Sequence, residues 1–293
     1  MSDRETWLAE RKTGIGASDS AAILGVSPWR SPVEVWADKT GFAAPDDTAN
    51  EAAEWGLRLE PTIAQALADR TGRQVACRPA FQIVRHPMLP WMFCTPDAED
   101  SDGRVVQIKT CSAYKAGEWR DEPPLQYQVQ VQHELEVLDR DEATLVVLIG
   151  GQRLRYYDVP RNQRFIAAMR DRLEAFWLCV QEMRMPTIDG TICTANALAR
   201  LHPQDNGEAV ELDPEAMNLV AEWEDAKRVA AEAENRKRLA ENMLRAAIGD
   251  ASYGVLPDGE MLSLLTQTRK AHEVKESTFR VLRRVNPKRK GNA

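Results

Sequence analysis

Side chains that could hydrolyse a phosphodiester occur in three short stretches of the chain. They are Glu60, Asp97 and the pair Gln107 and Lys109. Because side chains alternate along a strand, Gln107 and Lys109 share one face, and we expect the strand that ends at Asp97 to be its hairpin neighbour. Such hydrolysis needs oxygen ligands for a divalent cation and a positive charge near the attacking water. We therefore expect Lys109 to orient or deprotonate this water, and Glu60 to bind a second metal ion or hold its water.

The same residue types also have a plainer interpretation. A Pro-Asp pair, here Pro96-Asp97, commonly opens a turn, and Gln-x-Lys on a strand is typical of a solvated sheet face. Taken alone, these residues leave both a nuclease site and an ordinary surface open.

Periodicity and turn signals predict the elements that would position these residues. Over residues 1–45 we expect short helices around turns, with Ser18 or Asp19 placed to cap a helix that starts near Ala21. The other helices and the strands form a mixed α/β pattern. The helices are expected over 50–71, 124–138 and 161–185, and the strands over 74–77, 81–85, 92–95, 104–110, 142–149 and 153–159.

Composition shifts divide the chain into a core and an appendage. We expect a core domain over 1–190, a linker over 191–211, a helical arm over 212–248, and a small hairpin with a basic tail over 249–293. The arm is rich in Ala, Glu, Lys and Arg, and its low apolar content argues against a core helix. The tail is as consistent with a solvated end as with a DNA contact.

The charge distribution and the cysteine content limit which kinds of protein this chain could be. The net charge of the chain is −7, but residues 269–293 contain nine Lys and Arg and only two Glu. A protein that is acidic as a whole could therefore still bind phosphate through one basic surface. The five cysteines form no C-x-x-C pair, which argues against a disulfide framework and a four-cysteine zinc site. The sequence has no long apolar run and no secretory signal, so we expect a cytoplasmic protein without a membrane span.

Six motifs in series resemble those of the YqaJ-like viral recombinases, relatives of the lambda-type alkaline exonucleases. Each motif is weak alone, but their order over residues 1–160 is specific. They are an opening motif made of Arg11, Gly14–Asp19, Ile23–Gly25 and Ser27-Pro28, then Lys39–Gly41 at the expected spacing, Gly56–Pro61, Thr95–Asp97, Gln107–Thr110 and Tyr127–Gln132.

The resemblance implies a PD-(D/E)XK nuclease fold, in which helices flank a mixed central sheet. It also implies a metal-dependent exonuclease that digests linear double-stranded DNA from its 5′ ends in phage-type homologous recombination. Mg²⁺ or Mn²⁺ would be the cofactor, and the protein would be a homo-oligomer, a trimer in the lambda-type enzymes. A single-strand annealing protein would be its partner in the cytoplasm of a bacterial host.

The same resemblance assigns roles to individual positions. Asp97, position 107 and the carbonyl of Ile108 would bind the metal ion, and Lys109 would be catalytic. A pocket for the 5′-phosphate is also implied, and its donors suit phosphate oxygens. The pocket would consist of Arg11, Ser18, Thr95 and Gln130. The plainer interpretations are a helix cap for Ser18 and a polar helix face for Gln130.

Gln107 departs from the family, which carries Glu at this position. A carboxamide still offers an oxygen but has one negative charge fewer, so we expect weaker metal binding and a slower reaction. The chain is either a natural variant or a disabled Glu→Gln form. Two other functions remain open beside the exonuclease. The chain could be a catalytically silent DNA-end-binding protein on the same fold, or an endonuclease.

Overall fold

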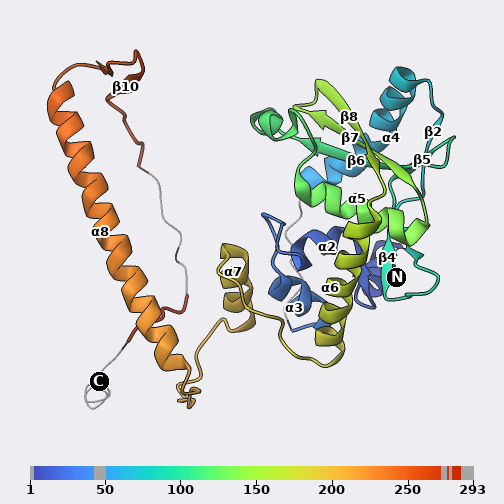
Figure 1. The fold of residues 1–293 in the computed structure, drawn as a ribbon, viewed down its shortest axis with the longest axis horizontal. Coiled ribbons are helices and arrows are strands. Elements are labelled where there is room, and N and C mark those ends of the chain that lie inside the picture. The colour runs from blue at the N-terminus through green and yellow to red at the C-terminus, as the bar shows by residue number, and fades with distance from the viewer. Residues whose placement is uncertain (1–2, 43–50, 272–275, 277–278, 285–293) are drawn as a thin grey trace. The chain divides into compact units, whose positions relative to one another are not determined.

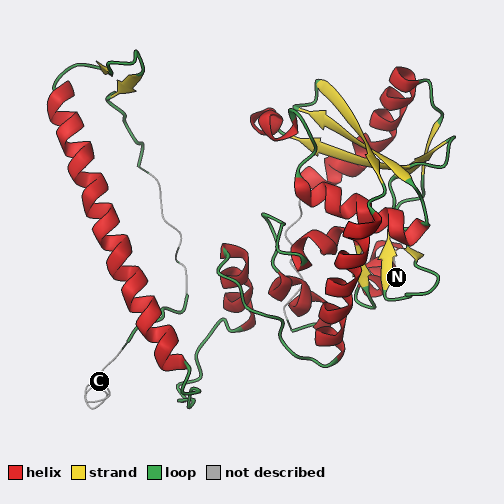
Figure 2. Cartoon of the chain, viewed as in Figure 1, coloured by secondary structure: helices red, strands yellow, loops and turns green. Residues whose placement is uncertain are grey.

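The computed structural model describes residues 3–42, 51–271, 276 and 279–284 (Figures 1 and 2). The chain forms two compact units, Met1–Pro203 and Gln204–Ala293. Within the described ranges, none of the helices is both long enough and apolar enough to cross a membrane.

A five-stranded mixed sheet is the centre of the first unit. Its order is β2-β5-β6-β7-β8, in which β6 and β7 are parallel and the other neighbours are antiparallel. The strands are β2 (Val75–Cys77), β5 (Ala98–Asp100), β6 (Val105–Cys111), β7 (Glu142–Ile149) and β8 (Arg153–Pro160). This sheet, with helices on both sides, confirms the predicted fold class (Figure 1).

Alternation along β6 and β7 explains why each face of the sheet receives a helix. On one face, Ile63 and Leu67 of α4 (Glu51–Thr71) pack in one cluster with Val106. On the other face, Leu135 of α5 (Leu125–Leu138) packs in one cluster with Val105 and its neighbours on β7. Because residues two apart share a face, Gln107 and Lys109 lie on the α5 side with Val105.

A second, smaller sheet corrects one prediction about the site. Its order is β1-β4-β3, formed by Ile15–Gly16, Met92–Cys94 and Val84–Arg85. The predicted strand over 92–95 therefore does not pair with the strand that carries Gln107. That neighbour is β5, which follows Asp97 and was not predicted, because three residues that include Glu99 and Asp100 give no apolar strand signal.

The remaining helices of the first unit surround this small sheet. Buried apolar residues of α2, α3 and α6 form one cluster with Ile15 and Met92. The helices are α1 (Asp3–Arg11), α2 (Ala17–Ile23), α3 (Pro32–Thr40) and α6 (Gln163–Gln181), and the 3₁₀ helix η1 (Ala113–Trp119) lies between β6 and α5 along the chain.

The predicted linker over 191–211 is wrong in its first half. Residues Ile192–Leu201 form α7, whose N-terminus is capped by Thr191 accepting from the backbone N–H of Thr194. This helix packs on α3, and Arg200 forms an ion pair with Glu34. The buried residues of α7 are the small Thr194 and Ala197, while Ile192 is exposed, so the segment gives only a weak signal of a core helix.

The second unit contains the expected helix and hairpin. Helix α8 (Ala216–Ile248) has no buried residue, and β9 (Tyr253–Val255) pairs antiparallel with β10 (Met261–Ser263). Ion pairs along α8, such as Arg228 with Glu232, support a helix without a packed face. Most of the basic tail, including residues 285–293, lies outside the described residues.

A buried histidine ties α5 to α2 and makes stability depend on pH. The Nε2–H of His133 donates to the carbonyl of Phe93 (3.0 Å), so its Nδ1 accepts from the Ser20 hydroxyl (2.6 Å). Burial lowers the pKa of His133 from 6.5 to about 3. Below pH 6.5 this histidine is therefore protonated in the unfolded chain but stays neutral in the folded chain. The folded state loses stability relative to the unfolded state as the pH falls below 6.5.

We expect His133→Gln to remove this pH-dependent contribution. Between pH 7 and pH 5 the wild type should lose about 2 kcal/mol of unfolding free energy more than the variant does. Urea unfolding of both proteins at the two pH values measures this difference. Equal losses in the two proteins would show that His133 is not the group responsible.

Candidate functional site

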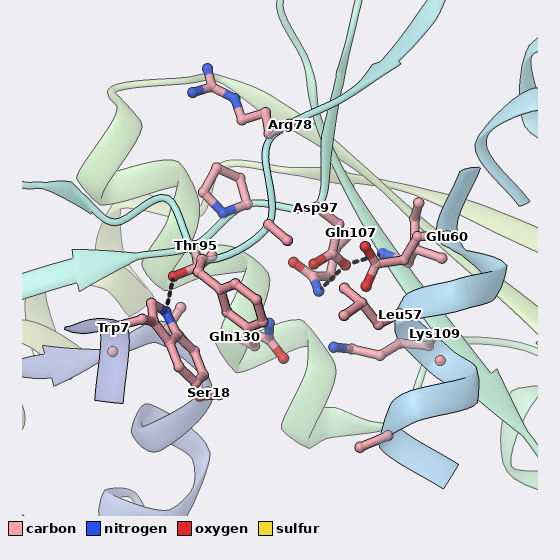
Figure 3. Close-up of a pocket in the computed structure, with 18 of the residues that line it drawn as sticks. Trp7, Ser18, Leu57, Glu60, Arg78, Thr95, Asp97, Gln107, Lys109 and Gln130 are labelled. Atoms are coloured by element: carbon pink, nitrogen blue, oxygen red, sulfur yellow. Dashed lines mark hydrogen bonds between the residues drawn. The ribbon is translucent and has the colours of Figure 1, made fainter. Parts of the chain in front are cut away.

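One cavity of about 940 Å³ in the first unit brings together every residue that the sequence analysis assigned to the site (Figure 3). Elements far apart in the chain line it, from α1 and α2 to β6 and α5. The assigned residues in its wall are Arg11, Ser18, Glu60, Thr95, Asp97, Gln107, Ile108, Lys109 and Gln130.

Asp97 is at the centre of the acidic side of this cavity. One of its carboxylate oxygens accepts hydrogen bonds from the Gln107 side-chain amide and from the backbone N–H of Ile108 (2.7 Å). The antiparallel register of β5 and β6, with Ala98 opposite Val106, brings these groups together. Figure 3 shows the Asp97 and Gln107 side chains facing each other, with Glu60 beside them. The other polar atom of Gln107, Oε1, is buried and has no hydrogen-bond partner among the described residues.

Burial raises the pKa of both assigned carboxyls. Burial, followed by the charge of Asp97, raises the pKa of Glu60 on α4 to about 7. Burial also raises the pKa of Asp97, while Lys109 and two hydrogen bonds oppose this effect. A pocket in which negative charge is this costly would be stabilised by a cation.

Lys109 reaches the same cavity from the α5 side of β6. Its ammonium lies 5.4 Å from the centroid of the Tyr127 ring. This position agrees with the expectation that Gln107 and Lys109 share one face of their strand.

Two of the residues assigned to the phosphate pocket, Arg11 and Ser18, lie on the N-terminal helices α1 and α2. The Arg11 guanidinium donates to the Ser18 hydroxyl (3.1 Å) and lies 4.8 Å from the centroid of the Trp7 ring. The Trp7 indole N–H in turn donates to the Thr95 hydroxyl (3.3 Å). The predicted cap role of Ser18 is wrong, because Gly16 occupies the cap position of α2 and Ser18 lies inside the helix.

Gly14 brings this helix to the cavity. A Cβ at Gly14 would lie 2.3 Å from the carbonyl oxygen of Trp91, so a side chain there would separate β1 from β4. The following residue, Ile15, pairs with Met92, and α2 begins two residues later. Glycine at position 14 is therefore a packing requirement for placing Ser18.

A buried ion cluster, which sequence reasoning missed, fixes Arg11. The Asp19 carboxylate lies 3.1 Å from Arg11, 3.0 Å from Arg30 and 2.7 Å from the Lys39 ammonium. Burial alone would raise the pKa of Asp19, but these cations together hold it well below its usual range. The motifs containing Asp19 and Lys39 were visible in the sequence, but their pairing across 20 residues was not.

Glu134 is a second residue that the sequence analysis missed. It is completely buried on α5, lines the cavity, and accepts a hydrogen bond from the Gln130 amide (2.9 Å). The only signal was its position four residues after Gln130, on the same side of the helix.

Comparisons with known proteins agree with the motifs. Residues 6–141 match the YqaJ-like viral recombinase domain. The uncharacterized protein YqaJ of Bacillus subtilis (strain 168) is 32% identical over 259 residues, which cover 86% of this chain and 81% of that protein. The chain belongs to the YqaJ-like viral recombinase family. The predicted resemblance to YqaJ-like recombinases is therefore confirmed.

Two solved structures are similar to parts of this YqaJ-like chain. An alkaline exonuclease from Laribacter hongkongensis, LHK-Exo, is 19% identical with a TM-score of 0.48, and the match covers 61% of this chain and 93% of that one. A phage-related exonuclease from Haemophilus somnus 129PT is 13% identical with a TM-score of 0.43, and the match covers 58% and 94%.

The donors in the cavity of this YqaJ-like protein fit a divalent cation. Asp97 and Glu60 offer carboxylate oxygens, and Gln107 offers a buried amide oxygen with no partner within the described part of the chain. Mg²⁺ and Mn²⁺ prefer such oxygen ligands. The described residues contain no cluster of three His, Cys, Asp or Glu arranged to hold a metal ion. Position 107, which contributes an amide and not a carboxylate, adds no acidic residue to the cavity.

Proposed function

We propose that this protein is a divalent-cation-dependent exonuclease that digests linear double-stranded DNA from its 5′ ends during phage-type recombination. The observation that carries the proposal is the convergence of two sets of residues in one cavity. The acidic set would hold Mg²⁺ or Mn²⁺, and the set around Arg11 would hold a terminal phosphate. Membership of a viral recombinase family supports the recombination role.

The acidic set defines where hydrolysis would occur. Asp97, Gln107 through Oε1, the Ile108 carbonyl and Glu60 would hold the cation. When bound, the cation would polarise the scissile phosphate and stabilise the charge that develops on it. Lys109 would orient the attacking water and take part in moving its proton. The hydrogen bonds from Gln107 and Ile108 to Asp97 keep this carboxylate in one orientation.

The phosphate set explains a preference for DNA ends. Arg11, Ser18, Thr95 and Gln130 present a guanidinium, two hydroxyls and a carboxamide to the cavity, and all of these groups can donate to phosphate oxygens. Asp19 holds the Arg11 guanidinium in place before DNA binds. Internal cutting would not need a separate pocket for a terminal phosphate, so this set favours an exonuclease over an endonuclease.

Digestion of matched linear and covalently closed circular duplexes in Mg²⁺ tests the proposal. We expect 5′-phosphorylated linear DNA to lose its 5′ strands, and circles to stay intact. Cutting of circles would indicate an endonuclease. Binding of DNA ends without digestion of either substrate would indicate the silent end-binding alternative.

Gln107→Glu is expected to increase the rate about tenfold at limiting Mg²⁺. The substitution restores one negative charge beside Asp97 and strengthens attraction for the cation. Initial rates on the linear duplex, measured over a Mg²⁺ titration, test this expectation. An unchanged titration curve would mean that Gln107 is already an adequate natural ligand.

We also propose that the second unit serves assembly, with a second copy in a homo-oligomer or with an annealing protein. Helix α8 exposes apolar side chains such as Met217, Leu239 and Met243. Its acidic side chains are concentrated over 222–234 and its basic ones over 236–245. Light scattering of the full chain against a chain lacking residues 204–293 tests this proposal, and equal oligomeric states together with equal DNA affinity would refute it.

A further inference from the structure

The cavity contains a third carboxyl that the proposed mechanism does not use. Glu134 is 0% exposed, and its Oε2 is buried without a hydrogen-bond partner among the described residues. Burial raises its pKa to about 8, and the charge of Asp97 is the next largest cause. Leaving a carboxyl oxygen unpaired in the interior costs free energy, so its presence here calls for a physical reason.

Another buried acid on the same helix shows how such a cost is normally offset. Glu136 forms ion pairs with Arg161 and with Arg170 (3.2 Å). Glu134 has no ion pair of this kind within the described residues. The hydrogen-bond donor that the described part of the chain gives it, Gln130, is neutral, and a glutamine at position 134 would accept the same bond without burying a carboxyl.

Glu134 and Gln107 face the same space from two elements. Gln107 lies on the α5 side of β6, α5 contacts β6, and both residues line the cavity. Each has a buried oxygen without a partner in the described structure, Oε2 of Glu134 and Oε1 of Gln107. The position that lacks a carboxylate and the additional carboxyl thus occur in the same pocket.

The charges in this pocket do not balance. Asp97 raises the pKa of Glu60 on α4 and of Glu134 on α5, so it is within electrostatic reach of both. Lys109 lowers the pKa of all three carboxyls. When ionised, three carboxylates exceed one ammonium, and a divalent cation would offset the difference.

We propose that Glu134 supplies from α5 the negative charge that Gln107 does not supply from β6, so that cation binding in this pocket depends on Glu134. The inference rests on the proposed cation-dependent function and names a further positioning residue for it. The role requires charge near the cation and no direct bond to it, which agrees with the lack of a three-acid cluster in the described residues.

Calorimetric titration of the full chain with Mn²⁺, without DNA, tests the inference by binding alone. We expect Glu134→Gln to weaken Mn²⁺ binding about tenfold or more. The double variant Glu134→Gln with Gln107→Glu moves the charge back to β6 and should recover the wild-type affinity to within about threefold. Glu54→Gln is the matched control, because Glu54 lines the rim of the same cavity with a 61% exposed side chain. It should bind Mn²⁺ like the wild type.

The outcomes separate this inference from the proposed function. If the wild type binds Mn²⁺ and Asp97→Asn does not, while Glu134→Gln binds like the wild type, the inference is wrong and the cation site stands. Failure of the double variant to recover affinity would also refute it, since charge would then not be what Glu134 contributes. If the wild type itself binds no Mn²⁺, both fail. Circular dichroism and melting curves check that each variant is folded before its affinity is compared with that of the wild type.

Discussion

Asp97→Asn should lower the rate of DNA digestion about a thousandfold or more. The substitution keeps the shape of the side chain and removes the negative charge that raises the pKa of both Glu60 and Glu134. The Gln107 amide and the Ile108 N–H donate to the same Asp97 oxygen, so the asparagine oxygen can still accept both hydrogen bonds and the substitution mainly removes charge. Loss of a group that stabilises a charged transition state costs about 10² to 10³ in rate, and loss of the cation itself adds to this.

The measurement is the initial rate of nucleotide release from a 5′-phosphorylated linear duplex, together with Mn²⁺ affinity. Asp102→Asn is the matched control, because this exposed acid lies in the turn between β5 and β6 and outside the cavity. The control should retain wild-type rates. If Asp97→Asn kept more than about a tenth of the rate, the acidic side of the cavity would not be the site of hydrolysis.

Much of the site was predictable because the relevant elements carry strong local signals. The run RVVQIKT alternates clearly enough to place Gln107 and Lys109 on one face, and the structure places both in one cavity. Strand β7 is a long apolar run and β8 mixes buried with exposed residues, so both strands are detectable from the sequence. The motif around Arg11 and Ser18 indicated a shared role, and a hydrogen bond joins them.

The features that were missed depend on contacts between distant segments. A strand signal at Met92–Cys94 does not say which sheet the strand joins, and β5 is too short and acidic to be detected. An acidic residue in a helix normally indicates a solvent-exposed face, yet Asp19 and Glu134 are both fully buried. Their burial is decided by the cations and strands that pack against them, which no local pattern records.

Lys109→Gln separates chemistry from binding in the same pocket. We expect the rate to fall about 10² to 10⁴-fold, the range for a residue that assists proton transfer. Mn²⁺ affinity should not fall, because the acidic set is unaltered and the substitution removes a positive charge that lies near Glu60, Asp97 and Glu134. Affinity for a 5′-phosphorylated end should change by less than about threefold, since the Arg11 set is unaltered. Single-turnover rates at saturating Mn²⁺, with end binding measured in Ca²⁺, give these quantities.

The matched control for this variant is Lys115→Gln. Lys115 also lies over an aromatic ring, 5.2 Å from the centroid of Trp29, but it is exposed and outside the cavity. A fall in rate only for Lys109→Gln would therefore reflect its place beside Asp97 and not the loss of a surface charge. If Lys109→Gln instead weakened end binding and left the single-turnover rate unchanged, Lys109 would be a phosphate anchor, and another group would have to move the proton of the attacking water.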